Sequence, residues 1–331
     1  VLVDAGGYLM ASCQAALRAR RSITILGWDF NSRTRLHFDP LPEGAPPALL
    51  GEFLNHLVRR NRRLRVNVLN WDYPMVYGTD REFPPLYGFG WKPARRVRLR
   101  YDDTHPVGGS QHQKIVLIDD AVAFVGGIDL ALNRWDSPAH APHDPRRTAY
   151  GKPYPPVHDL MVALDGEAAR ALAAIARERW RLATGNELKP VHADHDPWPP
   201  ALVPDLTAVD VGIARTMPAR SERPAVREVE QLYLDMIAAA RREIYIENQY
   251  FTAPRIAAAL EKRLAEPEGP EVVLVLRLLS HGWLEEHTMH VLRSGLIRQV
   301  RKADRYARFR VYYPHIPGLP EGWCLDVHSK A

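Results

Sequence analysis

Two halves of this 331-residue chain share one order of segments, and this internal repeat is the feature that most limits the possible folds. Four segments of the first half each match a segment that lies 207 to 221 positions later. The matched pairs are residues 19–25 and 240–246, 66–69 and 273–276, 98–101 and 310–313, and 112–114 and 328–330. One match is weak evidence, but four in the same order predict a duplication. The alternative interpretation is that generic helix–strand units resemble one another.

Helical and strand patterns alternate within each half. Short apolar runs rich in β-branched residues are typical of buried strands, and they occupy residues 23–26, 66–69, 115–118 and 122–125. Residues 166–185 carry apolar side chains at helical spacing and end at Gly185, a common helix stop. We therefore expect two α/β lobes packed as a pseudo-dimer. The first spans residues 1–200 and the second 205–331, and the Pro-rich stretch 190–204 connects them.

The chain carries a formal net charge of +5 and has a pI of about 9.2. This excess suits an anionic substrate or surface, although charge alone favours the simpler interpretation of a solvated, arginine-rich surface. Cys13 and Cys324 form no close pair and no metal-type spacing, so no disulfide framework is expected. No transmembrane run and no signal peptide is visible. Because the chain starts at Val1 and stops at Ala331 inside a strand-like run, we expect a fragment at both ends.

The segment from His112 to Asp119 carries the chemistry. Residues two apart on a strand point to the same face, so His112 and Lys114 share a face and Gln113 points away. The chain then turns and ends a hairpin at Gly126-Gly127, where glycines let backbone N–H groups approach a ligand.

A histidine and a lysine presented twice suit a phosphate ester. The lysines donate to phosphoryl oxygens. Of the histidines, His112 and His328, one attacks phosphorus while the other protonates the leaving oxygen. We expect no cofactor and no divalent metal, because the lysines and hydrogen-bond donors offset the charge of the transition state.

HxKxxxxD followed by Gly-Gly resembles the signature of the phospholipase D superfamily. The first motif is matched in full at His112, Lys114 and Asp119, and the second at His328 and Lys330. The flanks are similar to those of phospholipase D proper, and they comprise residues 27–30, 126–130, 134–136 and 244–251. This resemblance spans nearly the whole chain.

The resemblance implies an α/β fold with two duplicated α/β/α sandwich lobes, which contain mixed sheets and are related by a pseudo-two-fold axis. The second lobe is expected to be truncated, because it stops within the second motif, and the fragment itself is expected to be inactive.

The resemblance also implies roles for the histidines and lysines. His112 would form the phosphohistidine intermediate, and His328 would act as general acid and later as base. Lys114 and Lys330 would bind the phosphate.

Acidic residues would support these groups. Asp119 would support its motif, and Asp159 would bond His112 and fix its tautomer. Asp129 stands where many relatives have asparagine, which puts its role as a phosphate-side donor in doubt because a carboxylate accepts and does not donate. The expected substrate-side residues are Gly126, Gly127, Asp129, Glu247, Asn248 and Gln249.

The implied function is a phosphodiesterase that cleaves a glycerophospholipid, first of all phosphatidylcholine, on the headgroup side, with water or an alcohol as acceptor. Alternatives within the superfamily are a cardiolipin-synthase-like phosphatidyltransferase and a nuclease. Nucleic acid is not expected, because the arginines are spread along the sequence. An alternative of another class is a non-catalytic lipid- or phosphate-binding module. We expect a monomer that associates peripherally with a membrane, on its cytoplasmic side.

Overall fold

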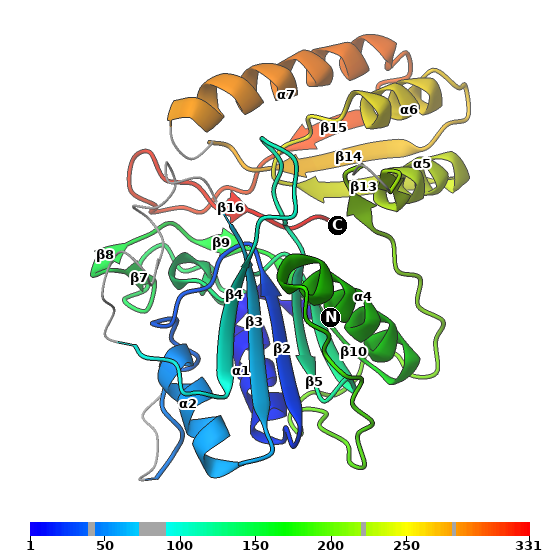
Figure 1. Cartoon of the computed structure of the whole chain (residues 1–331). Coiled ribbons are helices and arrows are strands. Elements are labelled where there is room, and N and C mark those ends of the chain that lie inside the picture. Colours follow the sequence, from blue (N-terminus) through cyan, green and yellow to red (C-terminus); the bar gives the residue numbers. More distant parts are fainter. Residues whose placement is uncertain (39–43, 73–90, 220–222, 280–282) are drawn as a thin grey trace. The chain divides into compact units, whose positions relative to one another are not determined.

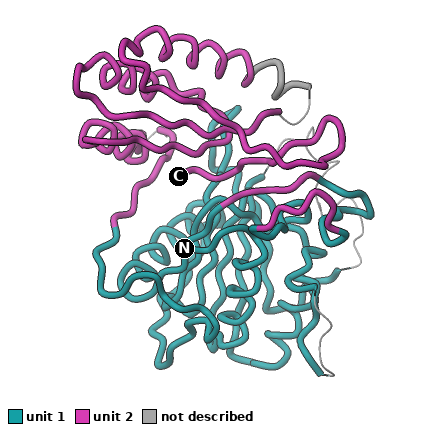
Figure 2. Tube along the Cα trace, turned by 180° about the vertical axis from the view of Figure 1, so that it is seen from behind, with its two compact units in different colours: residues 1–138, 145–154, 160–211 teal, residues 139–144, 155–159, 212–331 magenta. Residues whose placement is uncertain are grey.

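The computed structural model describes residues 1–38, 44–72, 91–219, 223–279 and 283–331, with the backbone alone for 283–288. The chain divides into two compact units (Figure 2). Unit 1 comprises residues 1–138, 145–154 and 160–211, and unit 2 comprises residues 139–144, 155–159 and 212–331. Two short segments from the first half of the sequence therefore belong to the second unit.

Unit 1 is built on a seven-stranded mixed sheet with the order β1-β10-β6-β5-β2-β3-β4. Strands β2, β3 and β4 are parallel, and the other neighbours are antiparallel. The strands are β1 Leu2–Val3, β2 Ser22–Gly27, β3 Arg65–Trp71, β4 Val97–Asp102, β5 Lys114–Ile118, β6 Val122–Gly126 and β10 Leu160–Asp165. The other elements are α1 Asp4–Leu17, α2 Leu50–Arg60, α4 Gly166–Thr184, the 3-10 helix Leu132–Arg134, and the hairpin of β7 Thr148–Ala149 and β8 Lys152–Pro153.

Helices cover both faces of this sheet. Figure 1 shows α4 in front of the strands and α1 behind them. Because both faces are covered, the central strands are buried over almost their whole length, which explains their unbroken apolar runs. The predicted strands are confirmed as β2, β3, β5 and β6. The predicted helix is confirmed as α4, which ends at Gly185 with a φ of 70°.

Unit 2 contains a parallel sheet with the order β13-β14-β15. One core joins inward residues of this sheet, such as Ile244, Ile246 and Leu274, to residues of its helices, such as Leu260 and Val300. The strand order resembles that of β2-β3-β4, while the duplication itself stays a prediction. The strands are β9 Val157–His158, β11 Thr216–Met217, β12 Val226–Arg227, β13 Glu243–Asn248, β14 Glu271–Leu276, β15 Phe309–Tyr312 and β16 Asp326–Val327. The helices are α5 Glu228–Ala239, α6 Pro254–Leu264 and α7 Trp283–Ala303.

The stretch 190–204, predicted to connect two lobes, packs on unit 1. The Val191 N–H donates to the Asp120 carboxylate over 3.0 Å, and Trp198 packs against the hydrophobic core. Exposed residues from Val203 to Val211 then lead into unit 2. None of the helices in the described part of the chain has the length and apolar character needed to cross a bilayer.

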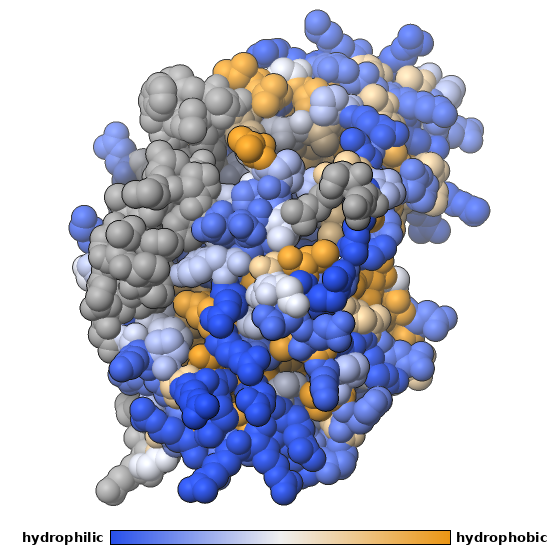
Figure 3. Space-filling view, viewed as in Figure 1, coloured by the Kyte–Doolittle hydropathy of each residue, from blue (hydrophilic) through white to orange (hydrophobic). Residues whose placement is uncertain are grey.

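Arginines gather at one edge of the unit 1 sheet, where β2, β3 and β4 begin. The Arg65 N–H donates to the Arg21 carbonyl over 3.0 Å, and the Val66 N–H donates to the Arg96 carbonyl over 2.9 Å, so these positions are adjacent. Hydrophilic residues cover this end of the unit in Figure 3. Arginines that are distant in the sequence thus converge in the fold. The exposed ones are Arg21, Arg59, Arg60, Arg62, Arg63, Arg65 and Arg95.

Candidate active site

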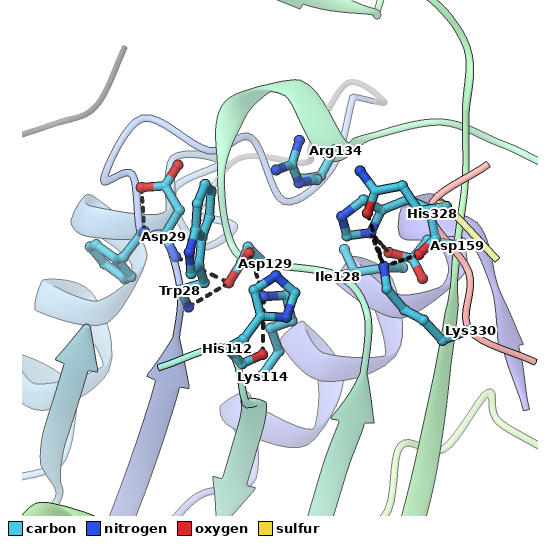
Figure 4. A network of polar contacts seen from close by, with 12 residues as sticks. Trp28, Asp29, His112, Lys114, Ile128, Asp129, Arg134, Asp159, His328 and Lys330 are labelled. Carbon is cyan, nitrogen blue, oxygen red and sulfur yellow. Dashed lines mark hydrogen bonds and ion pairs between the residues drawn. The ribbon is translucent and has the colours of Figure 1, made fainter. Parts of the chain in front are cut away.

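The opposite edge of the unit 1 sheet carries the first histidine–lysine pair. Strand β5 is antiparallel to β2, with Leu26 opposite Ile115, so β5 begins where β2 ends. His112 lies just before β5, and Lys114 is its first residue. Trp28 follows β2, and Asp129 follows β6. The sheet therefore brings these side chains to one edge (Figure 4).

Lys114 is held by a buried ion pair. Its Nζ lies 3.0 Å from Asp129 Oδ2, and both side chains are almost fully buried. The other carboxylate oxygen accepts the N–H groups of Trp28 and Asp29, over 2.9 and 3.2 Å. Burial alone would raise the pKa of Asp129, but Lys114, Arg134 and these hydrogen bonds outweigh it, and the pKa lies below its ordinary value. Asp129 is thus an ionised acceptor that orients Lys114.

Trp28 forms a wall beside both members of the pair. Its ring lies 5.9 Å from the His112 ring, and Lys114 Nζ lies 5.8 Å from its centroid. Trp71 stacks on Trp28, with ring centroids 5.6 Å apart. His112 and Lys114 therefore face a common aromatic surface, as expected for residues two apart.

Asp119 lies at the far end of β5, away from this edge. Its carboxylate accepts the backbone N–H groups of Arg20, Arg21 and Ser22, over 2.6, 2.8 and 2.6 Å. The side chain is fully buried. Asp119 therefore ties the end of β5 to the start of β2, which is a structural contribution to the motif.

The Gly-Gly turn has a structural role at the contact between β6 and β10. The Gly127 N–H donates to the Leu160 carbonyl over 3.0 Å, so it is used within the sheet. A Cβ on Gly126 would collide with the Leu160 carbonyl and lie 2.8 Å from Met161 Cα. Gly126 is therefore needed because β10 approaches β6 closely, and the approach of a ligand to the Gly-Gly backbone stays a prediction.

Unit 2 carries the second pair on β16, which runs parallel to β9. Val327 pairs with His158, and this register brings the next residues, His328 and Asp159, together. His328 Nδ1 lies 2.6 Å from Asp159 Oδ2, and both side chains are buried (Figure 4). A carboxylate only accepts, so Nδ1 donates and Nε2 is the nitrogen available for chemistry.

This bond corrects the role that the resemblance implied for Asp159. The carboxylate was expected to fix the tautomer of His112, and the structure pairs it with His328 instead. Asp159 contacts His328 because β9 pairs with β16, and no local sequence pattern predicts this pairing. A buried ion pair between Arg277 and Asp326, 3.2 Å apart, anchors β16 from the side of β14.

The residues after β13 support Lys330. Asn248 and Lys330 form an antiparallel bridge, and Glu247 exchanges two backbone hydrogen bonds with Ala331, of 2.8 and 3.0 Å. Lys330 Nζ donates to Gln249 Oε1 over 3.5 Å and to the His328 carbonyl. The Glu-Asn-Gln run therefore positions the second pair, and its contact with a substrate stays a prediction.

Sequence reasoning missed two residues that serve the first pair, Arg179 and Asp102. Arg179 of α4 donates to the Asp102 carboxylate and to Gln113 Oε1, and Gln113 is the neighbour of His112. One signal was present in the sequence, because Arg179 occupies a buried position among the apolar residues Ala176 and Trp180.

Each unit thus presents a histidine, a lysine and a buried carboxylate. A lysine donates to phosphoryl oxygens, and a histidine serves as nucleophile or as proton donor and acceptor. Each unit by itself therefore carries side chains of the kinds that bind a phosphoryl group and transfer protons.

Comparison with known proteins agrees with this chemistry. No protein-family model matches the chain. Phospholipase D A of Dictyostelium discoideum is 24% identical over a match that covers 89% of this chain and 26% of that protein. Phospholipase D alpha 1 of Carica papaya is 25% identical, covering 93% and 44%. Phospholipase D alpha 1 of Arabidopsis thaliana is 28% identical, covering 64% and 31%. The chain thus spans less than half of each relative.

One solved structure shares the fold. The phosphatidylserine synthase of Haemophilus influenzae Rd KW20 superposes with a TM-score of 0.53 and 11% identity, over 98% of this chain and 74% of that one. At this identity, the likeness shows a common α/β architecture.

Proposed function

The chain belongs to the phospholipase D superfamily, and we propose that it is a phosphodiesterase that cleaves glycerophospholipids on the headgroup side. Two histidine–lysine pairs carry the proposal. His112 lies beside Lys114, whose charge Asp129 stabilises. His328 lies beside Lys330 and bonds Asp159. The phospholipase D relatives favour a phospholipid substrate, with phosphatidylcholine as the first choice.

The proposed reaction has two steps, in which both histidines act on one phosphodiester. A ring nitrogen of neutral His112 attacks phosphorus while the bond to the headgroup oxygen breaks. Protonated His328 gives its Nε2 proton to that oxygen, and Asp159 favours this charged form. His328 then removes a proton from water, which attacks the phosphohistidine and releases phosphatidate. An alcohol in place of water gives a phosphatidyl alcohol.

The lysines serve the phosphoryl group in this scheme. Ammonium groups donate hydrogen bonds to its non-bridging oxygens, whose charge changes during the transfer. Asp129 keeps Lys114 oriented, and Gln249 does the same for Lys330.

A transfer assay tests the proposal. The full-length protein is purified and supplied with phosphatidylcholine vesicles and ethanol, and phosphatidylethanol is measured. We expect His112→Ala and His328→Ala to lower its formation by roughly 10³-fold or more. His315→Ala changes an exposed histidine after β15 and should have no effect. Full activity of His112→Ala contradicts the mechanism, and cleavage of DNA without turnover of phospholipid contradicts the substrate class. Vesicle binding without turnover indicates the non-catalytic module.

A second substrate separates the two histidines. A phosphatidyl p-nitrophenyl ester has a leaving group that departs without a proton, so only the second step needs His328. We expect His328→Ala to release one p-nitrophenolate per chain in a burst and then to stall as a covalent adduct. His112→Ala should show no burst. The opposite pattern would exchange the two roles.

A further inference from the structure

Arg179 is a buried arginine whose only described hydrogen bonds lead toward the first histidine. It lies on α4 with its side chain 3% exposed. Nη2 and Nε donate to Asp102 Oδ2 over 2.5 and 3.2 Å, and Nη1 donates to Gln113 Oε1 over 3.0 Å. Burying a charged pair is costly. The pair of Arg179 and Asp102 therefore needs an explanation other than stability. The hydrogen bond from Arg179 to Gln113 provides one.

Gln113 is the middle residue of the His-Gln-Lys triplet. Alternation along the strand turns it away from Lys114 and toward α4, where Arg179 binds its amide oxygen. The predicted direction of this side chain is confirmed. Through Gln113, the backbone on the C-terminal side of His112 is attached to α4.

The N-terminal side of His112 leads back to the same carboxylate. Gln111 Nε2 donates to the carbonyl and hydroxyl oxygens of Thr104, over 3.3 and 3.4 Å. Thr104 in turn donates its N–H to Asp102 Oδ1 over 2.9 Å. The two glutamines that flank His112 are thus both tied to Asp102, one through Thr104 and one through Arg179.

His112 needs such an attachment because it lies outside the sheet. Strand β5 begins at Lys114, so His112 lies in the segment that leads into the strand. In-line attack at phosphorus depends on placement of the nucleophile, and a 1 Å displacement costs roughly 100-fold in rate.

We propose that Asp102 and Arg179 form a positioning clamp, which holds His112 through its two neighbouring glutamines. The clamp rests on the proposed function for its role in catalysis, whereas its effect on the backbone does not. Arg179 and Asp102 are positioning residues, since they act through Gln113 and Thr104.

The test removes the link without unpairing the buried charges. Gln113→Leu keeps the volume and loses the acceptor, while Gln113→Glu keeps an acceptor for Arg179. We expect Gln113→Leu to lower kcat by roughly 10- to 100-fold at unchanged KM and melting temperature. It should also speed amide exchange over residues 103–113. Gln113→Glu should keep most of the activity. Arg179→Lys, which loses the fork geometry, should resemble Gln113→Leu.

Arg177→Gln is the matched control, because Arg177 lies on α4 like Arg179 but forms its ion pair with Asp120. It should leave exchange over residues 103–113 and kcat unchanged. If Gln113→Leu exchanges the amides of residues 103–113 as slowly as the wild-type protein does, the clamp is wrong. If the wild-type protein is active and Gln113→Leu has the same kcat, the clamp is also wrong. If the wild-type protein turns over no phospholipid, the proposed function fails, and the exchange rates alone decide the clamp.

Discussion

Two buried carboxylates give the two histidine–lysine pairs different supports. Asp129 pairs with the lysine of the first, and Asp159 pairs with the histidine of the second. A carboxylate beside a lysine keeps a fixed cation in place, while a carboxylate beside an imidazole stabilises the form that gives up a proton. The ring of His328 therefore has a carboxylate partner, Asp159, which the motif alone does not reveal.

The ion pair of Asp129 with Lys114 should make the stability of the fold depend on pH in the acidic range. Its pKa in the folded chain lies below the ordinary value of about 3.9. The ionised carboxylate therefore stabilises the fold above that value, and this contribution disappears as the pH falls through the folded-state pKa. We expect Asp129→Asn to lower the free energy of unfolding by about 3 kcal/mol at neutral pH, and by progressively less below about pH 4.

Urea unfolding between pH 3 and 7 measures this difference. Asp194→Asn is a suitable control, because the carboxylate of Asp194 is largely exposed and forms a surface ion pair with Arg20. Its effect should be small throughout. A loss that is equal at every pH in Asp129→Asn would show that the ionised carboxylate is not its source.

Residue-level prediction succeeded where chemistry follows a local pattern and failed where it depends on distant pairing. The spacing of His112 and Lys114 predicted a shared face, and both lie beside Trp28. The partner of Asp159 is 169 positions away, across a strand pair of two residues. Two residues carry no readable periodicity, so the pairing with His328 was beyond the sequence.

At the scale of elements, the contact of β6 with β10 depends on Gly126. A methyl group there meets the backbone of β10, which has no room to move within a paired sheet. We expect Gly126→Ala to lower the free energy of unfolding by about 1–3 kcal/mol. Gly7→Ala, in an exposed and open position of α1, should be neutral or stabilise by about 0.5–1 kcal/mol. Equal stabilities of the two variants in urea would contradict this packing.

The elements that were predicted share strong local signals. Strands β2, β3 and β5 are buried on both faces and read as apolar runs, and α4 carries an apolar stripe closed by Gly185. The short strands β1, β9 and β16 have no such signal, since each contains two residues. Strand β1 pairs with the longer β10, whereas β9 and β16 pair with each other across the sequence.

At the scale of the whole molecule, the order of the chain and the division into units disagree. Unit 2 takes residues 139–144 and 155–159 from the first half of the sequence, and β9 in the second of these pairs with β16. We therefore expect a chain cut between Val203 and Val211 to stay together. A protease site inserted in this exposed stretch tests it, because the fragments should co-elute in buffer and separate in urea. Separation in buffer would contradict the division into units.

The basic excess also looks different at this scale. Arginines that are scattered in the sequence gather where β2, β3 and β4 begin, because parallel strands start at one edge. The histidine–lysine pair of unit 1 lies at the other edge. Within unit 1, this arginine cluster thus lies at the edge opposite to the histidine–lysine pair, which composition alone does not show.

The two ends of β5 turn the spacing of the motif into a measure of length. Lys114 begins the strand beside Asp129, and Asp119 follows its last residue and binds the start of β2. The four intervening residues follow the strand, and at about 3.3 Å per residue the segment from Lys114 to Asp119 extends over about 17 Å. Their identities are free to vary among buried side chains, but their number is not, since one extra residue turns every later side chain to the opposite face. The spacing between the lysine and the aspartate of the motif therefore matches the length of β5.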